Sequence, residues 1–419
     1  MLNKSLDYKN QSTQIVKKTL LTLSILVLAR LGVFIPILGI DHHEFQMSVA
    51  KNSFVSFLNV FSGGGFSTIG IFALGIVPYI NASLIIQLLV KAIPYLENLQ
   101  KEEGENGRQK LIQLTRYLTL VWGILQSITV ALWIKPYVFN WNLHFIINIT
   151  LTLTCGSIII LWFSELITNK GFGNGASLLI FQNIISNIPN TLKKLHINFD
   201  NFTDIVKLCS VSTIFIFMLI ITVLIQEGIR NIEIISARQL TQELSTNMRN
   251  YLPLKLNQGG VMPLVFASAI IAIPKYFTNN IQQQGTKNLV YYIFFHSYFY
   301  LLLYLIFIVL FSRFYGSIIM NPNDIANNLK KMGVSIPKIR PGKTTSTYLQ
   351  KIFDRLVIIS SISLFFIALI PSIIENITEF QLLANFGATS LIILVGVSIE
   401  TGKQVQAYLV SLKYRDMSE

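Results

Sequence analysis

The sequence predicts an all-α protein that crosses a membrane several times. Of its 419 residues, 52% are hydrophobic and only 13% are charged, whereas a soluble domain has about 25% charged residues. The apolar residues also form long blocks rather than the amphipathic spacing of surface helices. One apolar segment, at 54–61, is followed by three glycines and is far shorter than the roughly 20 residues that a crossing helix needs. We therefore expect a multi-pass helical protein with one re-entrant helix, folded into a cavity because irregular backbone at membrane depth must be covered by protein or line an aqueous space.

The long apolar blocks give ten candidate spans, and the short segment at 54–66 is additional. Because ten is an even number, both chain ends are expected on the same side of the membrane. The spans are expected at 19–40, 71–92, 112–133, 143–166, 174–192, 208–227, 259–279, 289–312, 352–372 and 381–399.

The distribution of lysine and arginine orients these spans. About 25 of the 33 Lys and Arg residues fall on the side of the chain ends and about 7 on the other, which indicates that the ends face the cytosol, or the stroma of an organelle. The polar segment Met1–Lys18 fits a cytosolic lead-in rather than a secretory signal or transit peptide. The net charge of +13 has two open interpretations, namely topology with attraction to anionic lipid, or a docking surface.

Five spans precede residue 200 and five follow it. This division predicts an N-terminal half (1–192), a hinge loop (193–207) and a C-terminal half (208–419). An odd number of spans in each half would give the halves opposite orientations, as in inverted repeats, although no internal sequence repeat is visible. Two cytosolic loops, about 227–256 and 314–351, are longer than simple connections require and predict a surface for a soluble partner.

No group of side chains predicts catalysis, a metal or a cofactor. The glycine run at 171–175 lacks the preceding strand of a nucleotide site, and the 342–344 fragment has a proline where a phosphate-binding loop needs its first glycine. The five histidines have no zinc-ligand spacing. Cys155 and Cys209 both lie in apolar blocks, so neither a disulfide nor a thiol metal site is expected.

A few polar residues in the spans require an explanation. Asn81 and Gln87 lie in the second span, and Asn257 and Gln258 lie at the start of the seventh. These side chains would be costly against lipid. They either form static hydrogen bonds between helices or make a polar seam between two helices that separate, and the residues alone do not decide between these interpretations.

Five long motifs, in the same order along nearly the whole chain, resemble the SecY family, the protein-conducting channels of the general secretory pathway. The fourth of them is NPNDIANNLKKMGVSIPKIRPGKTTSTYLQK (321–351), and its NLKKMGVSIPKIRPGKTTS part looks most like cyanobacterial and plastid members. The other motifs are FSGGGFSTIGIFALGIVPYINASLIIQLL (61–89), GFGNGASLLIF (171–181), LPLKLNQGGVMPLVFAS (252–268) and LVGVSIETGKQVQAYL (394–409).

The resemblance implies a plug and a pore ring. Without it, the apolar ring positions would be interpreted as ordinary core. An apolar constriction stops ions by dewetting and yields around a passing polypeptide. Ala176 is smaller than the branched residue expected there, which would widen the ring. The implied plug residues are Phe54, Phe57, Leu58, Phe61, Gly63, Gly64, Gly65 and Phe66, and the implied ring residues are Ile76, Ile80, Ala176, Ile180, Val265 and Ile393.

The resemblance also implies a lateral gate between the second and seventh spans, with Asn81, Gln87 and Asn257 as its polar seam. The long cytosolic loops would dock SecA or the ribosome through Arg238 and Arg340, because the planar guanidinium fork pairs with phosphate and carboxylate groups. In this family the channel is passive: it conducts unfolded preproteins that carry signal sequences and releases transmembrane segments laterally into membrane lipid. SecA, with ATP, or the ribosome supplies the energy.

Further partners implied by the resemblance are SecE and SecG. The motifs favour a plastid thylakoid membrane, with a bacterial plasma membrane as the alternative. An inverted-repeat secondary transporter is the alternative function, because it explains the spans and the short segment equally well. A transporter predicts a charged site at the membrane midplane, and apart from Arg30 the charged residues of the predicted spans lie near the span ends.

Overall fold

The computed structural model describes residues 2–51, 62–101, 104–193, 202–236, 250–260, 297–378 and 382–418, together with 262–264, 266, 267 and 270. Two compact units are present. One consists of Met1–His196 with Val397–Glu419, and the other of Ile197–Gly396. The expected hinge at 193–207 lies mostly outside the described residues, so the division into two five-span halves stays a prediction.

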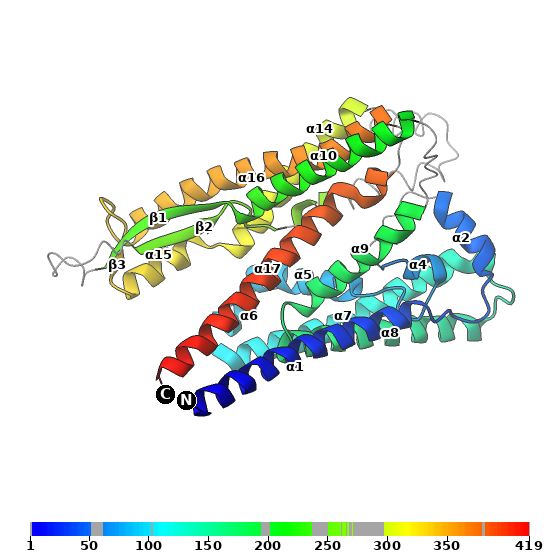
Figure 1. Ribbon diagram of the computed structural model, residues 1–419, viewed down its shortest axis with the longest axis horizontal. Coiled ribbons are helices and arrows are strands. Elements are labelled where there is room, and N and C mark those ends of the chain that lie inside the picture. Colours follow the sequence, from blue (N-terminus) through cyan, green and yellow to red (C-terminus); the bar gives the residue numbers. More distant parts are fainter. Residues whose placement is uncertain are drawn as a thin grey trace. The chain divides into compact units, whose positions relative to one another are not determined.

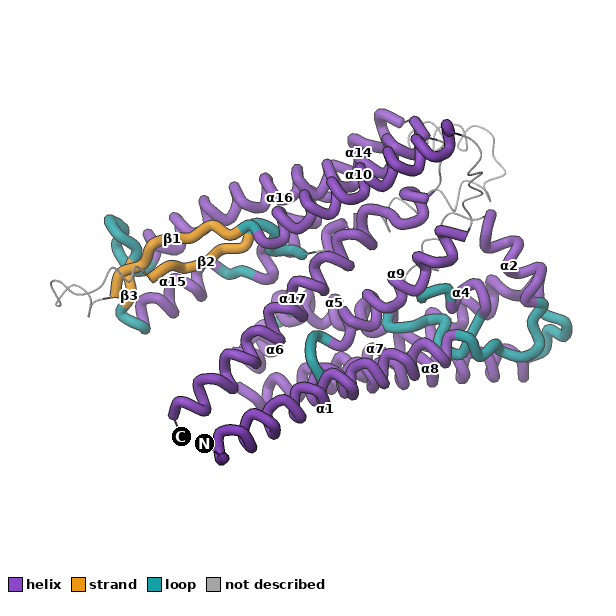
Figure 2. Tube along the Cα trace, viewed as in Figure 1, coloured by secondary structure: helices purple, strands orange, loops and turns teal. Residues whose placement is uncertain are grey.

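The first unit is helical, and Figures 1 and 2 trace its elements in chain order. Helix α5 packs against α7, α7 against α8, and α8 against α9 and α1. The elements are α1 (Leu2–Val33), α2 (His42–Lys51), α4 (Gly65–Thr68), α5 (Val77–Ala92), α6 (Pro94–Lys101), α7 (Gly104–Ile134), the 3-10 helix η1 (Lys135–Tyr137), α8 (Leu143–Lys170), α9 (Gly175–Lys193) and the end of α17 (Leu382–Ser418).

The core of the first unit forms around Phe45 in α2. Its fully buried ring lies edge-on to Trp133 and Tyr137, at 5.2 and 5.5 Å between centroids. Residues from α4, α7 and α8 complete this cluster, including Phe66, Ala131 and Leu153. The core therefore joins the start of the chain, the segment after the three glycines, and two long helices.

The second unit contains α10 (Phe202–Glu227), α14 (Ser297–Ile319), α16 (Lys343–Thr378) and most of α17. Helix α16 packs against both α14 and α10. Buried Met218, Ile308 and Leu364, one from each of these three helices, meet in a core with Leu391 and Ile392 of α17. This core is built from helix faces alone.

The expectation of an all-α fold is wrong in one place. The two long loops contain β1 (Ile229–Ser236), β2 (Asn250–Lys255), α15 (Pro322–Lys331) and β3 (Val334–Ser335). The strands form an antiparallel sheet in the order β2-β1-β3, with Ile232 opposite Leu252 and Ile235 opposite Ser335. Apolar and polar residues alternate in the segment IRNIEIIS, so that one face of β1 packs into a buried cluster. This alternation is typical of a strand, but it is too short to be recognised beside the long apolar blocks of the sequence.

Helical residues overlap every predicted span, although only a few residues of 259–279 are described. By length and composition, four helices of the described residues can cross a membrane: Gly104–Tyr137, Leu143–Lys170, Leu301–Lys331 and Lys343–Pro371. A fifth candidate joins Val77–Ala92 to Pro94–Gln100 across a bend of 105°. The count of ten spans and the inverted halves therefore stay predictions.

Candidate functional site

The glycine break lies inside the first unit as a turn against α1 and α9. We call residues Gly63–Gly65 the glycine turn. Gly63 and Gly64 have φ angles of +65° and +89°, a left-handed conformation that suits glycine because it has no Cβ. Gly63 is buried, and Arg30 of α1 donates a hydrogen bond from Nη1 to its carbonyl oxygen. Of the predicted plug, the positions 54, 57, 58 and 61 lie outside the described residues.

Irregular backbone continues from the glycine turn to the start of α5. Ile69 has a φ of +41° and Gly75 a φ of +52°. The amide of Ile71 donates to the carbonyl of Ile35, and Ile37 donates to Ile69, both across to the end of α1. Other amides of the segment bond within it, such as Ala73 to Gly70 and Gly75 to Phe72. These amides therefore find partners within the protein, which is the condition for non-helical chain at membrane depth.

Four of the predicted ring residues form two pairs in the first unit. Ile76 is the N-cap of α5 and is 1% exposed, while Ile80 is half-buried one turn later. Ala176 is half-buried near the start of α9, and Ile180 is buried one turn beyond it. The two residues of each pair are four positions apart in the sequence, so they lie on the same face of their helix.

The other two predicted ring residues belong to the second unit. Ile393 is buried in α17, and Val265 lies outside the described residues. Because the pairs on α5 and α9 are in the first unit, closure of one ring by all six residues stays a prediction.

The predicted polar seam is divided in the same way. Asn81 is half-buried and Gln87 is exposed on α5, where the Gln87 side chain donates to Ser83 Oγ at 3.5 Å. Asn257 is 6% exposed and donates through Nδ2 to the carbonyl of Gly260 at 2.9 Å. The side chain of the neighbouring Gln258 is 9% exposed, and within the described part of the chain neither of its amide atoms has a hydrogen-bond partner, which is costly for a buried polar group.

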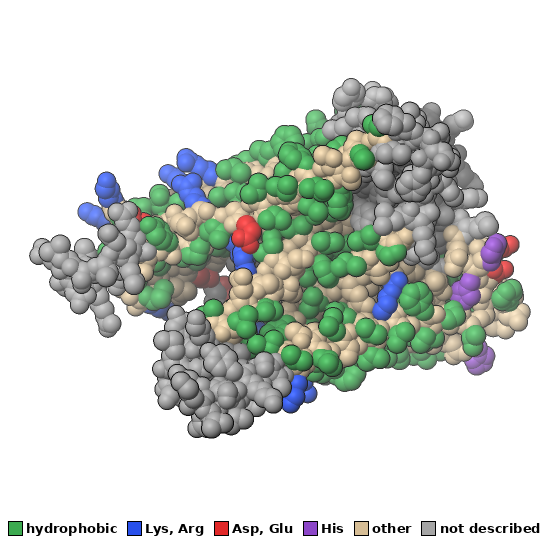
Figure 3. Space-filling view, in the orientation of Figure 1, with side chains coloured by type: hydrophobic (Ala, Val, Ile, Leu, Met, Phe, Trp, Pro, Cys, Tyr) green, Lys and Arg blue, Asp and Glu red, His purple; other side chains and the backbone are tan. Residues whose placement is uncertain are grey.

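The predicted docking residue Arg340 is exposed in the turn between β3 and α16. Lys338 and Gly342 on either side have φ angles of +63° and +109°, and Thr345 Oγ1 donates to the Arg340 carbonyl at 2.9 Å. Lysine and arginine side chains gather near the strands at the left of Figure 3. Arg238, the other predicted docking residue, lies outside the described residues.

The sheet connects the two predicted docking loops. Ile232 and Leu254 come from the first loop, and Ile336 from the second, and all three pack with Leu349 and Ile352 of α16 in one buried cluster. The two loops therefore form one folded surface rather than two separate ones. Sequence analysis missed this pairing because strand partners 100 residues apart leave no local signal.

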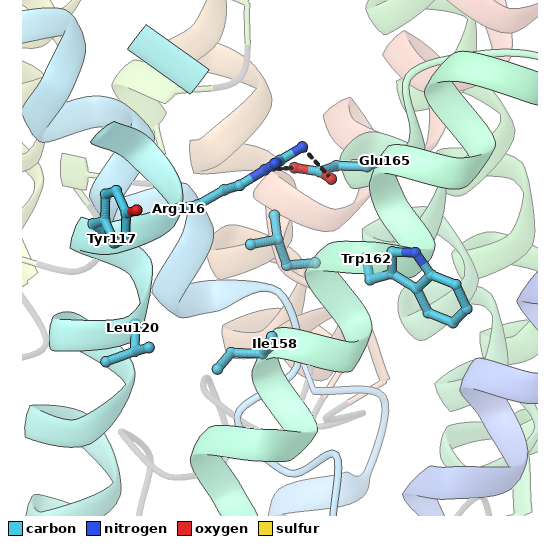
Figure 4. Close-up of a pocket in the computed structure, with 7 residues that line it drawn as sticks. Arg116, Tyr117, Leu120, Ile158, Trp162 and Glu165 are labelled. Atoms are coloured by element: carbon cyan, nitrogen blue, oxygen red, sulfur yellow. Dashed lines mark hydrogen bonds and ion pairs between the residues drawn. The ribbon is translucent and has the colours of Figure 1, made fainter. Parts of the chain in front are cut away.

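An ion pair on the outside of the first unit was also missed. Arg116 of α7 pairs with Glu165 of α8 through two bonds, Nε to Oε1 at 2.7 Å and Nη2 to Oε2 at 2.8 Å. It closes one end of a groove of about 310 Å³ lined by Tyr117, Leu120 and Trp162 among others, and Figure 4 shows the two charged groups pointing toward each other. Their positions near the cytosolic ends of adjacent predicted spans could have suggested the pair.

Comparison with known proteins gives the chain its family. The SecY family model matches residues 70–402. The chain is 56% identical over 410 residues to the protein translocase subunit SecY of Pyropia yezoensis, covering 98% of this chain and 100% of that protein. The chain belongs to the SecY family. It is also 45% identical over 418 residues to SecY of Synechococcus elongatus, covering 97% and 95% of the two chains. This SecY chain is thus a protein translocase subunit and a membrane channel protein rather than an enzyme.

Solved structures show the same fold. A structure of a protein-conducting channel aligns with 94% of this SecY chain and 93% of its own, with a TM-score of 0.64 at 18% identity. Sec61 in the canine ribosome-channel complex aligns with a TM-score of 0.58 at 18% identity, over 94% and 93% of the two chains. The mostly helical SecY and Sec61 channel fold is therefore confirmed.

Proposed function

We propose that this chain is the central channel subunit of the Sec translocase, which conducts unfolded preproteins across the membrane and releases transmembrane segments sideways into lipid. The observation that carries this proposal, beside family membership, is the protein-covered irregular segment from the glycine turn to Ile76. A helical membrane protein with no need to open has little use for such a segment, because each non-helical polar group must find a partner within the protein.

In the proposed resting channel, Phe54–Phe66 forms the plug and Ile76, Ile80, Ala176, Ile180, Val265 and Ile393 form the ring. The pairs one helix turn apart on α5 and α9 support two opposing walls of apolar side chains. An apolar constriction excludes water and therefore ions, while its side chains can change rotamer around a passing peptide. Because Ala176 is short, the plug contributes more to the seal at that position.

The lateral gate is proposed between α5 and the segment that follows Asn257. Asn81, Gln87 and Asn257 supply weak polar contacts, and the side chain of Asn257 already bonds within its own turn. The unpartnered amide of Gln258 adds a group that gains hydrogen bonds when water enters. A seam of this kind opens more readily than a packed apolar interface. An apolar segment of the preprotein can then move into lipid, and each Leu or Ile contributes a favourable free energy of transfer of a few tenths of a kcal/mol.

Energy for transport is proposed to come from SecA, with ATP, or from a translating ribosome. The folded surface of β1, β2, β3 and α15 supports this role because it joins both long loops and carries Arg340 on an exposed turn. A guanidinium in this position can bind phosphate oxygens of RNA or carboxylates of a motor protein bidentately. Arg238, in the sequence of the first long loop, is proposed as a second docking cation.

SecE and SecG are proposed as the small helical partners, and preproteins with signal sequences as the substrates. The host membrane is proposed to be the thylakoid, with the chain ends in the stroma. Relatives from the algae Pyropia yezoensis and Porphyra purpurea, 56% and 55% identical, support a plastid setting. The two halves, 1–192 and 208–419, joined by the hinge 193–207, are proposed to move relative to each other when the gate opens.

Reconstitution tests this function. The chain would be placed in liposomes with SecE, and uptake of a preprotein would be followed by protection from added protease, with SecA and ATP present. We expect protection that depends on ATP and on the signal sequence. A preprotein without its signal sequence is the control. Liposomes that take up no preprotein, yet accumulate a small solute or ion against its gradient, would contradict the channel and support the secondary transporter.

A further inference from the structure

Arg30 is a cation in the first predicted span and has an unusual partner. Its Nη1 donates to the backbone carbonyl of Gly63, thirty-three residues along the chain, and its guanidinium lies over the ring of Phe34 at 4.6 Å from the centroid. Among the residues that the structure describes, no carboxylate pairs with Arg30. A charged side chain within a membrane span is costly and, by default, functional.

A carbonyl partner differs from a carboxylate in what happens when the bond breaks. Separating Arg30 from a carboxylate in a low-dielectric site would leave two unpaired charges. Separating it from the Gly63 carbonyl leaves one charge and one dipole, and a water molecule can satisfy both. The contact is therefore firm in a dry cavity and weak once the cavity is wet, which suits a segment that holds its place only in the resting channel.

Helix α9 supports the same contact from the other side. A Cβ on Gly63 would lie 2.6 Å from Asn183 Oδ1 and 3.0 Å from Arg30 Nη1, so the turn fills the space between α1 and α9. The side chain of Gln182 donates through Nε2 to the carbonyl of Leu26 at 2.7 Å, one turn before Arg30. The two helices are thus fixed to each other beside the glycine turn.

We propose that Arg30 is a positioning residue that holds the glycine turn between α1 and α9 in the resting channel and thereby keeps that channel closed to ions. This inference rests on the proposed channel function and adds a residue to it. Arg30 acts on the seal through the backbone carbonyl of Gly63.

Two measurements on the reconstituted chain with SecE test the proposal. The first is the resting ion conductance of a planar bilayer, without preprotein or SecA. The second is the rate of disulfide formation between cysteines placed at Gly65 and Val33, in a chain whose Cys155 and Cys209 are alanine. Gly65 does not have a left-handed backbone, and a Cβ on it would lie 3.2 Å from Val33 Cγ1 at the end of α1, so this pair reports the position of the glycine turn against α1.

Arg30→Met is expected to raise the resting conductance about tenfold, because it removes a hydrogen bond to a charged group, and to slow the disulfide by a similar factor. Arg30→Lys keeps a charged donor and is expected to restore most of both values. Arg116→Met, which removes an exposed arginine of the same unit, is the matched control and should match the unsubstituted chain. Should Arg30→Met fail to assemble, Gly63→Ala displaces the turn with Arg30 intact and should change both values in the same direction.

An Arg30→Met channel with native conductance and native disulfide rate would overturn the proposal. The two hypotheses fail separately. An unsubstituted chain that takes up no preprotein contradicts the channel function, whereas the disulfide rate still reports whether Arg30 positions the turn. Unchanged preprotein uptake with an unchanged resting seal in Arg30→Met contradicts only the role of Arg30.

Discussion

The ring of Phe66 lies 5.9 Å, centroid to centroid, from the indole of Trp133 on α7. Phe66 directly follows the glycine turn and is buried in the aromatic and aliphatic core of the first unit. The glycine turn is thus held at two places, by Arg30 at the Gly63 carbonyl and by this ring one helical turn later. The second contact is apolar core packing, whereas the first is a hydrogen bond that water can replace.

Phe66→Ala is expected to destabilise the first unit by about 3 kcal/mol, since truncating a buried phenylalanine loses its transfer free energy and leaves a cavity. Unfolding in detergent micelles, followed by tryptophan fluorescence, measures this change. Phe139→Ala is the matched control, because Phe139 is 71% exposed and should change stability little. Equal stability of the two variants would show that Phe66 is not part of the core.

Gly156→Ala is expected to cost about 1–3 kcal/mol through overpacking. A Cβ there would lie 2.1 Å from the backbone oxygen of Ile71, in the irregular segment before α5. Gly402→Ala meets nothing within 4 Å and lies within α17, so it should stabilise by about 0.5–1 kcal/mol through helix propensity. Thermal unfolding of the two variants in parallel tests the contrast, and a tolerated Gly156→Ala would mean that α8 does not approach Ile71 so closely.

The ion pair between Arg116 and Glu165 can be tested by a double-mutant cycle. Its side chains are 50% and 25% exposed, so a coupling free energy of about 0.5–1 kcal/mol is expected. Arg116→Glu alone and Glu165→Arg alone should each lower the unfolding free energy, and the double exchange should recover part of the loss. Additive effects, with no recovery, would show that this ion pair contributes nothing to the packing of α7 against α8.

Arg340→Glu is expected to weaken binding of SecA or the ribosome about tenfold, because a like charge at an interface is repelled. Lys170→Glu makes the same charge change at the exposed end of α8, outside the proposed surface, and should leave binding unchanged. Binding would be measured at two salt concentrations, and the effect of Arg340→Glu should shrink at the higher one. Equal losses in both variants would indicate a general charge effect and not a docking site.

The membrane class and most helices could be predicted from sequence because apolar blocks report burial in lipid directly. Helix α8 begins at the predicted residue 143 and ends four residues beyond the predicted 166, whereas α7 begins eight residues before the predicted 112 and ends one residue after 133. The start of α5 was placed six residues early, at 71 instead of 77. The apolar composition of residues 71–76 does not show whether they are helical or irregular. Their irregular backbone is held by tertiary contacts, such as the hydrogen bond from the Ile71 amide to the Ile35 carbonyl, which a local sequence pattern does not reveal.

The candidate site was less accessible to sequence reasoning. Asn81 and Gln87 were recognised because polar groups are rare in spans, and Arg30 for the same reason, but its partner Gly63 was not. A backbone carbonyl has no sequence signature. The pairing of β1 with β3 was not predicted for a similar reason. Val334 and Ser335 form a strand that is too short to be recognised in the sequence without its partner.

The most direct test of the channel account is crosslinking from the ring to a chain in transit. A photoreactive residue would replace Ile80, Ile180 or Ile393 in turn, in reconstituted membranes where a folded block stalls a secretory chain midway. Exposed Leu151 and Ile216 serve as controls on the outer helix surfaces. The account predicts crosslinks to the stalled chain from all three ring positions and none from the two controls. Silent ring positions, or equal crosslinking from the controls, would contradict a central polypeptide channel.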